Sequence, residues 1–191
     1  MNVYPLDEAK ALVRMVLEER YGLTLAEIYT DKVTQLSADD ANDLEKIMSR
    51  LAKGEPVQYV LGSTTFCGRQ FCVAPGVLIP RPETEILCEW VVNVHNNPFC
   101  ALQPPTPLRI LDVGTGSGCI AITLSLDMSN TVVSAYDISS EALLIARDNA
   151  IRLGAAVNFQ LKDALQLAAT EETFDIIVSN PPYICDSERT E

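Results

Sequence analysis

The order of apolar and polar residues separates a helical N-terminal stretch from a C-terminal stretch in which strands and helices alternate. Within residues 7–21, apolar side chains recur at helical spacing and predict one amphipathic helix, whose buried face comprises Ala9, Leu12, Val13 and Val16. Residues 23–29 predict a short second helix. Ser37 is a favourable N-cap for a third helix, which we expect to be closed by Gly54 and to bury Leu44, Ile47, Met48 and Leu51. Residues 1–57 therefore predict a small helical domain.

Residues 58–77 change in character and predict a β-hairpin connector. Two short segments, at 65–67 and 70–72, flank Gly68 and Arg69, which would place Phe66 opposite Phe71. The sequence thus predicts a boundary between the helical domain and a second domain over residues 78–191.

A helix is expected at the start of that second domain. Pro82 suits the first turn of a helix, and the positive N-terminal end of the helix favours the acidic residues Glu83 and Glu85. We expect this helix to end at Asn96 or Asn97, followed by a proline-rich surface loop.

From Leu108 onward, strand patterns alternate with helical patterns. Strands are expected at residues 108–113, 131–136, 157–161 and 174–179, and helices at 119–126 and from Ser139 or Ser140 to Gly154. This alternation is typical of βαβ units and predicts a parallel, Rossmann-like α/β sheet. The last strand is a short apolar run rich in β-branched residues, a composition typical of a strand that is buried on both faces.

Composition narrows the class of protein. The 191 residues are 48% hydrophobic without a long apolar run, and the first residues have neither a basic start nor an apolar core, so we expect neither a membrane span nor a secretory signal and place the protein in the cytoplasm. The net charge of −12 argues against direct, sequence-blind binding of nucleic acid and is easier to reconcile with a basic protein or an RNA-bound partner.

Cysteine and histidine usage excludes two kinds of site. The six cysteines form no C-x-x-C pair, so we expect reduced thiols and no zinc site. His95 is the only histidine, which argues against triad chemistry and against a histidine-rich metal site.

A glycine-rich turn follows the first strand of the sheet. Asp112 precedes Gly114, Gly116 and Gly118, directly before a helix, and glycines are needed where a ligand lies against the backbone. The spacing is G-x-G-x-G rather than that of the dinucleotide motif. Asp137 ends the second strand, where it can accept the hydroxyl groups of a ribose. Each acid alone could be a loop or cap residue, but together with the glycines they predict an adenosine-type cofactor, with Asp163 at the adenine rim.

The strand at 174–179 ends in Asn180-Pro-Pro-Tyr183. Neither proline has a backbone N–H, so strand pairing must stop there. The turn could present an amide side chain, free carbonyl groups and an aromatic ring to a planar amide or an exocyclic amine. A strand that ends in a proline-rich turn without further function is the alternative.

Four motifs together resemble those of the release-factor glutamine methyltransferases, the PrmC/HemK family of class I S-adenosylmethionine-dependent methyltransferases. They are GEPVQYVLG at 54–62, LIPRPETE at 78–85, LDVGTGSG at 111–118 and SNPPYI at 179–184. The resemblance extends over the whole chain. Since family members continue well beyond the last motif, it also implies that the methyltransferase domain is partial, truncated after that motif and lacking later strands.

The resemblance implies roles for individual residues. The turn that contains Asp112, Gly114, Thr115, Gly116, Ser117 and Gly118 would hold the methionine end of S-adenosylmethionine, Asp137 the ribose, and Asp163 and Ala164 the adenine. The motif Asn180, Pro181, Pro182 and Tyr183 would bind the glutamine of the Gly-Gly-Gln loop of a peptide-chain release factor, with Asn180 also beside the cofactor.

These roles suggest a mechanism without a general base. The Asn180 side-chain oxygen and the Pro181 carbonyl would accept the two N–H groups of the substrate amide, and Tyr183 would stack on the amide plane. This chemistry requires that the glycine turn and the Asn180 turn lie side by side. Ribosome association of the release factor, its identity, the oligomeric state and a docking role for the helical domain stay open.

Three other functions share parts of this pattern. A DNA adenine-N6 or RNA guanine-N2 methyltransferase would use the same Asn180 motif, but the acidic charge and the lack of a basic aromatic region count against both. A non-catalytic cofactor-binding fragment would be consistent with truncation.

Overall fold

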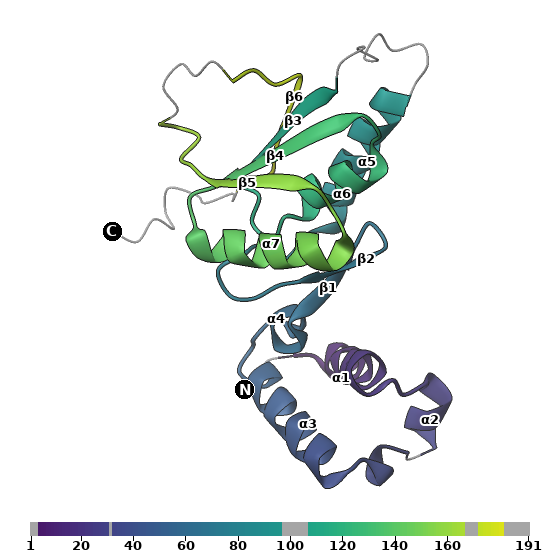
Figure 1. Ribbon diagram of the computed structural model, residues 1–191. Coiled ribbons are helices and arrows are strands. Elements are labelled where there is room, and N and C mark those ends of the chain that lie inside the picture. The colour runs from purple at the N-terminus through teal and green to yellow at the C-terminus, as the bar shows by residue number, and fades with distance from the viewer. Residues whose placement is uncertain (1–3, 31, 97–106, 167–171, 182–191) are drawn as a thin grey trace. The chain divides into compact units, whose positions relative to one another are not determined.

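A computed structural model describes residues 4–30, 32–96, 107–166 and 172–181 (Figure 1). Its contacts divide the chain into two compact units, Met1–Gly62 and Ser63–Glu191, which are described separately below. The division falls inside the expected connector 58–77; the assignment of domains to 1–57, 58–77 and 78–191 stays a prediction.

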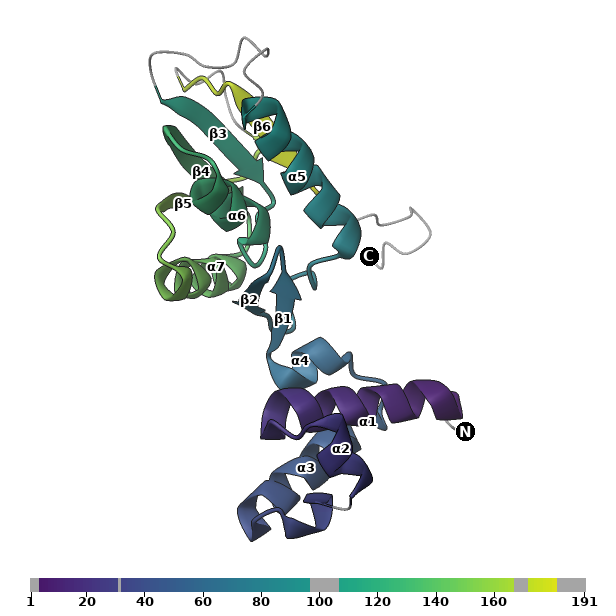
Figure 2. The same ribbon diagram turned by 90° about the vertical axis from the view of Figure 1, so that its right-hand side faces the viewer.

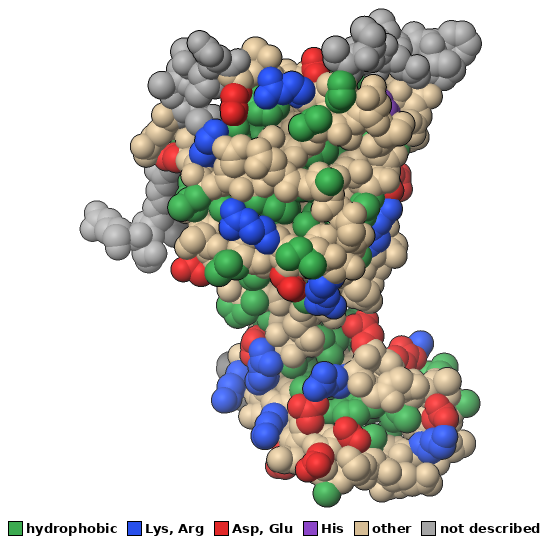
Figure 3. Space-filling model, in the orientation of Figure 1, with side chains coloured by type: hydrophobic (Ala, Val, Ile, Leu, Met, Phe, Trp, Pro, Cys, Tyr) green, Lys and Arg blue, Asp and Glu red, His purple; other side chains and the backbone are tan. Residues whose placement is uncertain are grey.

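The first unit consists of helices, which form where the sequence predicts them with two additions, at residues 32–35 and 57–61. The elements are α1 (Leu6–Tyr21), α2 (Leu25–Tyr29), a 3₁₀-helix (Lys32–Gln35), α3 (Ala38–Leu51) and α4 (Val57–Leu61). Their buried core comprises Val16, Ile47, Leu51, Val57 and Val60. The prediction that Val13 is buried was wrong: it is 38% exposed, and Leu17 is buried instead. Side chains of both charge signs are interspersed on the face of this unit shown in Figure 3.

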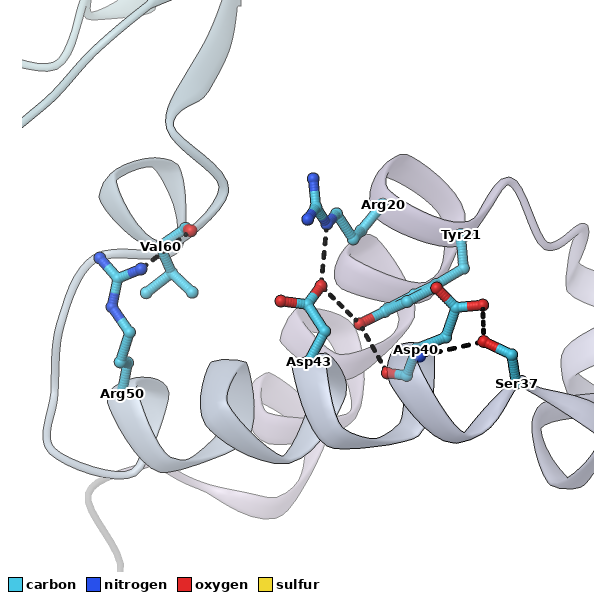
Figure 4. Close-up of polar contacts among 7 residues, drawn as sticks. All are labelled: Arg20, Tyr21, Ser37, Asp40, Asp43, Arg50 and Val60. Atoms are coloured by element: carbon cyan, nitrogen blue, oxygen red, sulfur yellow. Dashed lines mark hydrogen bonds and ion pairs between the residues drawn. The ribbon is translucent and has the colours of Figure 1, made fainter.

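Polar contacts fix the helices of the first unit to one another (Figure 4). The Asp43 carboxylate on α3 accepts hydrogen bonds from Arg20 Nε (3.0 Å) and from the Tyr21 hydroxyl (3.1 Å), both at the end of α1. Burial and the Asp43 contact raise the pKa of Tyr21 to about 12. The Arg50 guanidinium donates to the carbonyl oxygens of Tyr59 (3.1 Å) and Val60 (3.2 Å) in the short helix α4.

The second unit begins with a β-hairpin whose register differs from the prediction. Strands β1 (Ser63–Phe66) and β2 (Arg69–Cys72) are antiparallel, and Phe66 lies opposite Arg69, not Phe71. The two-residue turn is Cys67-Gly68, both with positive φ (46° and 70°), as a type I′ turn requires. The two aromatic rings still meet diagonally, edge to face, with centroids 5.9 Å apart.

The remaining strands form a parallel sheet in the order β5-β4-β3-β6. The strands are β3 (Leu108–Val113), β4 (Thr131–Asp137), β5 (Val157–Leu161) and β6 (Ile176–Ser179), and the helices of the unit are α5 (Pro82–Asn96), α6 (Cys119–Asp127) and α7 (Ser140–Leu153). These helices lie side by side on one face of the sheet, the face turned to the viewer in Figure 2. The core lies between them and the sheet and includes Phe66 and Phe71 of the hairpin.

Strand β6 differs from the prediction in length and burial. It starts at Ile176; before it, the Asp175 side chain accepts the Arg109 N–H (2.8 Å) and Phe174 packs edge to face against Tyr136. Val178 is 5% exposed, whereas Ile177 is 65% exposed, so the predicted burial on both faces was wrong for the described part of the chain.

Candidate functional site

The glycine turn joins the end of β3 to the start of α6. Gly114, Gly116 and Gly118 all have positive φ (71°, 54° and 82°), a conformation that glycine adopts without strain. The Tyr136 carbonyl at the end of β4 accepts the N–H groups of Gly114 (2.8 Å) and Thr115 (3.1 Å). The turn is therefore held by the neighbouring strand as well as by its own sequence.

The three glycines serve different purposes. A Cβ atom at Gly118 would lie 2.9 Å from Ile122 and 3.1 Å from Ala146, so this glycine permits close packing of α6 against α7. A Cβ atom at Gly114 or Gly116 would meet no atom within 4 Å. The backbone at these two positions therefore faces open space, where a ligand can approach it closely.

Asp137, the last residue of β4, binds to the glycine turn. Its Oδ2 accepts the Gly116 N–H at 2.8 Å, and its Oδ1 accepts the Ser139 N–H at 2.9 Å. The carboxylate thus lies between the glycine turn and the N-cap of α7, and each of its oxygens retains a lone pair for a further donor.

Asp112 lies beneath the turn and is fully buried. Its Oδ2 accepts the Thr115 hydroxyl (2.6 Å) and the Ala121 N–H (3.3 Å), while its Oδ1 has no partner. Burial raises the pKa of this carboxyl group to about 6, and the charge of Asp137 adds to the effect. Asp112 therefore stabilises the glycine turn from its buried side, through the hydrogen bonds to Thr115 and Ala121.

A cavity of about 620 Å³ opens beside the glycine turn. Of the predicted site residues, it is lined by Gly114, Gly116, Asp137, Asp163, Ala164, Asn180 and Pro181. Four others, Asp112, Thr115, Ser117 and Gly118, are not among its described lining residues; each is buried. Pro182 and Tyr183 lie outside the described residues.

The Asn180 turn lies beside the glycine turn, as the proposed chemistry requires. Strand β6 pairs in parallel with β3, with Ser179 opposite Val113, and the Ser179 hydroxyl donates to the Val113 carbonyl at 2.9 Å. The residues that follow these two strand ends, Gly114 and Asn180, consequently line the same cavity.

A second cavity of about 640 Å³ also has Asn180 in its lining. Its lining comprises Leu78, Arg81, Glu83, Thr84, Leu87, Ser179 and Asn180. Leu78, Ser179 and Asn180 line both cavities, and the Asn180 Nδ2 donates to Thr84 Oγ1 of α5 at 3.0 Å. Asn180 therefore stands where the two cavities meet.

Several residues that line the first cavity were not predicted from the sequence. Ile138 and Leu165 are apolar yet 75% and 97% exposed, and they closely follow the predicted acids Asp137 and Asp163. An apolar residue one or two positions after an acidic residue at a strand end could have indicated the apolar wall of a ligand site. Thr84 and Leu78 belong to a quoted motif, but no local pattern connects them to Asn180.

Within the described residues, no group of three or more His, Cys, Asp or Glu side chains is placed to hold a metal ion. The four cysteines described, Cys67, Cys72, Cys88 and Cys119, are free. No helix in the described part of the chain is both long and apolar enough to cross a membrane.

Two family models match this chain. The family described as "PrmC N-terminal domain" matches residues 4–62, and the family "Methyltransferase small domain" matches residues 100–191. A "Release factor glutamine methyltransferase" of Bacteroides thetaiotaomicron is 46% identical over 100% of this chain and 66% of the relative. A protein of the same name from Flavobacterium psychrophilum is 37% identical over 100% of this chain and 65% of the relative.

The fold also matches a solved structure. A "SAM Dependent Methyltransferase from Agrobacterium tumefaciens" aligns with 63% of this chain and 39% of that chain, with a TM-score of 0.50 and 22% identity. The chain thus has a class I methyltransferase fold, and it spans about two thirds of the length of its curated relatives (66% and 65%).

Proposed function

Because this chain belongs to the family of release factor glutamine methyltransferases, we propose that it transfers a methyl group from S-adenosylmethionine to the side-chain amide nitrogen of the glutamine in the Gly-Gly-Gln loop of a peptide-chain release factor. One observation carries the proposal: Asn180 lines both the cavity that has the glycine turn in its wall and a second, adjoining cavity. A donor and an acceptor can thus approach the same side chain from two sides.

The 620 Å³ cavity fits the cofactor. Gly114 and Gly116 leave open space in front of their backbone, where the methionine end can lie. The Asp137 carboxylate has lone pairs left for the ribose hydroxyls. Ile138 and Leu165 offer apolar walls that suit a flat adenine ring beside Asp163 and Ala164. When bound, S-adenosylmethionine supplies an electrophilic methyl group.

Asn180 binds the acceptor amide in this proposal. An amide nitrogen is a weak nucleophile, because its lone pair is delocalised, so its orientation is decisive. The Asn180 Oδ1 and the Pro181 carbonyl accept its two N–H groups, fix the nitrogen toward the cofactor cavity, and stabilise the positive charge that develops there. Tyr183 stacks on the amide plane. None of these roles requires a side chain to remove a proton before transfer; the methylated nitrogen loses one of its N–H protons to water afterwards, which leaves a neutral N-methyl amide.

The same proposal covers partners and location. The relatives' names give release factors as the substrate, which suits a chain with a net charge of −12 better than direct DNA binding does. The protein then acts in the cytoplasm, where release factors work, on free or ribosome-bound factor. We assign cofactor and acceptor binding to a methyltransferase domain at residues 78–191. Residues 58–77 connect this domain to the helical domain at residues 1–57.

Mass spectrometry of the Gly-Gly-Gln loop tests the proposal. We expect the wild-type chain to add one methyl group to that glutamine, and we expect Asn180→Ala to slow transfer roughly 100-fold or more while the cofactor Kd, measured by calorimetry, stays nearly unchanged. Asn158→Ala, an exposed position on β5, is the matched control and should leave both quantities at wild-type values.

Two results would contradict the proposal. Undiminished transfer by Asn180→Ala would remove the assigned role of this side chain. A wild-type chain that binds the cofactor and leaves the release factor unmodified, even at high enzyme concentration, would show that the chain is a cofactor-binding protein of another kind.

A further inference from the structure

We infer that Thr84 is a positioning residue for the reaction: it holds the Asn180 amide group so that Oδ1 faces the acceptor. The inference rests on the proposed function and names a residue that this function alone does not identify. Thr84 lies in the first turn of α5, 96 residues away from Asn180 in the sequence, and its hydroxyl oxygen accepts the Asn180 Nδ2 at 3.0 Å.

The surroundings of Thr84 support a role specific to the acceptor side. Its side chain is 5% exposed and lines the 640 Å³ cavity, whereas it is not among the described residues that line the cofactor cavity. Thr84 therefore forms part of the wall of the 640 Å³ cavity, the cavity proposed to receive the glutamine substrate. Its described side-chain hydrogen bond is to Asn180, which lines both cavities.

The chemistry of the two amide groups explains why the orientation matters. A carboxamide has an oxygen that only accepts hydrogen bonds and a nitrogen that only donates them. With its nitrogen on Thr84, Asn180 turns its oxygen away from Thr84, free to accept an N–H of the substrate. If the amide turned over, it would direct N–H groups at the N–H groups of the substrate, and the nucleophile would lose its anchor.

Enzyme kinetics of two Thr84 variants test this role. Thr84→Val keeps the shape of the side chain and removes the acceptor oxygen, so we expect kcat on the release factor to fall roughly tenfold, the effect of one lost hydrogen bond, with the cofactor Kd unchanged. Thr84→Ser restores the hydroxyl group and should return kcat to within about threefold of wild type. A role in packing alone would predict the opposite order, since serine leaves a methyl-sized gap and valine does not.

A double-mutant cycle and NMR complete the test. Adding Thr84→Val to Asn180→Ala should slow transfer no further, because the group that Thr84 orients is gone. The side-chain amide protons of Asn180, assigned from the signals missing in Asn180→Ala, should shift in Thr84→Val and stay near their wild-type positions in Thr84→Ser.

The outcomes separate this inference from the proposed function. A Thr84→Val variant with wild-type kcat, a Thr84→Ser variant as slow as Thr84→Val, or unshifted Asn180 amide signals in Thr84→Val would each overturn the inference. If the wild-type chain methylates no release factor, the proposed function fails. Two measurements then test the role of Thr84: the NMR signals of the Asn180 amide, and the affinity for a glutamine-containing loop peptide in the presence of S-adenosylhomocysteine. Thr84→Val is expected to shift the signals and to weaken peptide binding. If either effect is absent, the inference fails as well.

Discussion

Asp112 carries a buried carboxyl group beneath the glycine turn, and its burial has a consequence for stability. Since the pKa is about 6 in the folded protein against an ordinary value of 3.8, the folded state retains a proton that the unfolded chain has lost between these pH values. Stability must therefore fall as the pH rises from about 4 to about 6 and change little above that. Between pH values well below 3.8 and well above 6, this group lowers the free energy of unfolding by about 3 kcal/mol.

We expect Asp112→Asn to remove this part of the pH dependence, because an amide accepts the same hydrogen bonds without ionising. The free energy of urea unfolding, measured at pH 5.2 and at pH 7.5, should drop by about 1 kcal/mol more in wild type than in Asp112→Asn. Asp148→Asn, an exposed position on α7, should behave as wild type does. Equal pH dependence in Asp112→Asn and wild type would show that Asp112 is already ionised at pH 5.2.

At the scale of elements, Asn149 of α7 joins the hairpin to the glycine turn. Its side chain is 1% exposed, accepts the Cys72 N–H (2.7 Å), and donates to the carbonyl oxygens of Cys72 (3.0 Å) and Ser117 (2.9 Å). One side chain on a helix thus satisfies backbone groups of both β2 and the turn that borders the cofactor cavity.

We expect Asn149→Ala to destabilise the protein by about 2 to 4 kcal/mol, because three hydrogen bonds are lost and buried backbone groups stay unsatisfied. Freeing the Ser117 carbonyl should also loosen the glycine turn and raise the cofactor Kd several-fold. Urea unfolding and calorimetry measure the two effects, with exposed Asn158→Ala as control. A stability loss with an unchanged Kd would mean that the turn keeps its shape without Asn149.

The elements themselves were largely predictable from the sequence, because apolar periodicity, the N-caps Ser37 and Ser139 and the glycine turn are all local signals. The hairpin register was wrong because its local turn is Cys67-Gly68, whereas two other features were missed because a distant residue decides them. Helix α4 was missed: Arg50 of α3 satisfies its terminal carbonyls, which no pattern inside residues 57–61 reveals. The contact of Thr84 with Asn180 spans 96 residues and likewise leaves no local pattern.

At the scale of the whole chain, two separate hydrophobic cores underlie the two units. Leu51 belongs to the core of the helical unit and Leu124 to the core under the sheet, and they are 5% and 0% exposed. All described residues that line the cofactor cavity belong to the second unit. Weakening the first core should therefore leave cofactor binding intact if the units unfold independently.

Hydrogen exchange on two matched variants tests that independence. Leu51→Ala, with an expected local loss of about 2 to 5 kcal/mol, should lower amide protection within residues 4–62 and leave both the protection of residues 63–181 and the cofactor Kd at wild-type values. Leu124→Ala should show the reverse pattern and weaken cofactor binding. If Leu51→Ala lowered amide protection throughout the chain, the two cores would unfold as one cooperative unit. The stability of the cofactor site would then depend on the helical unit as well.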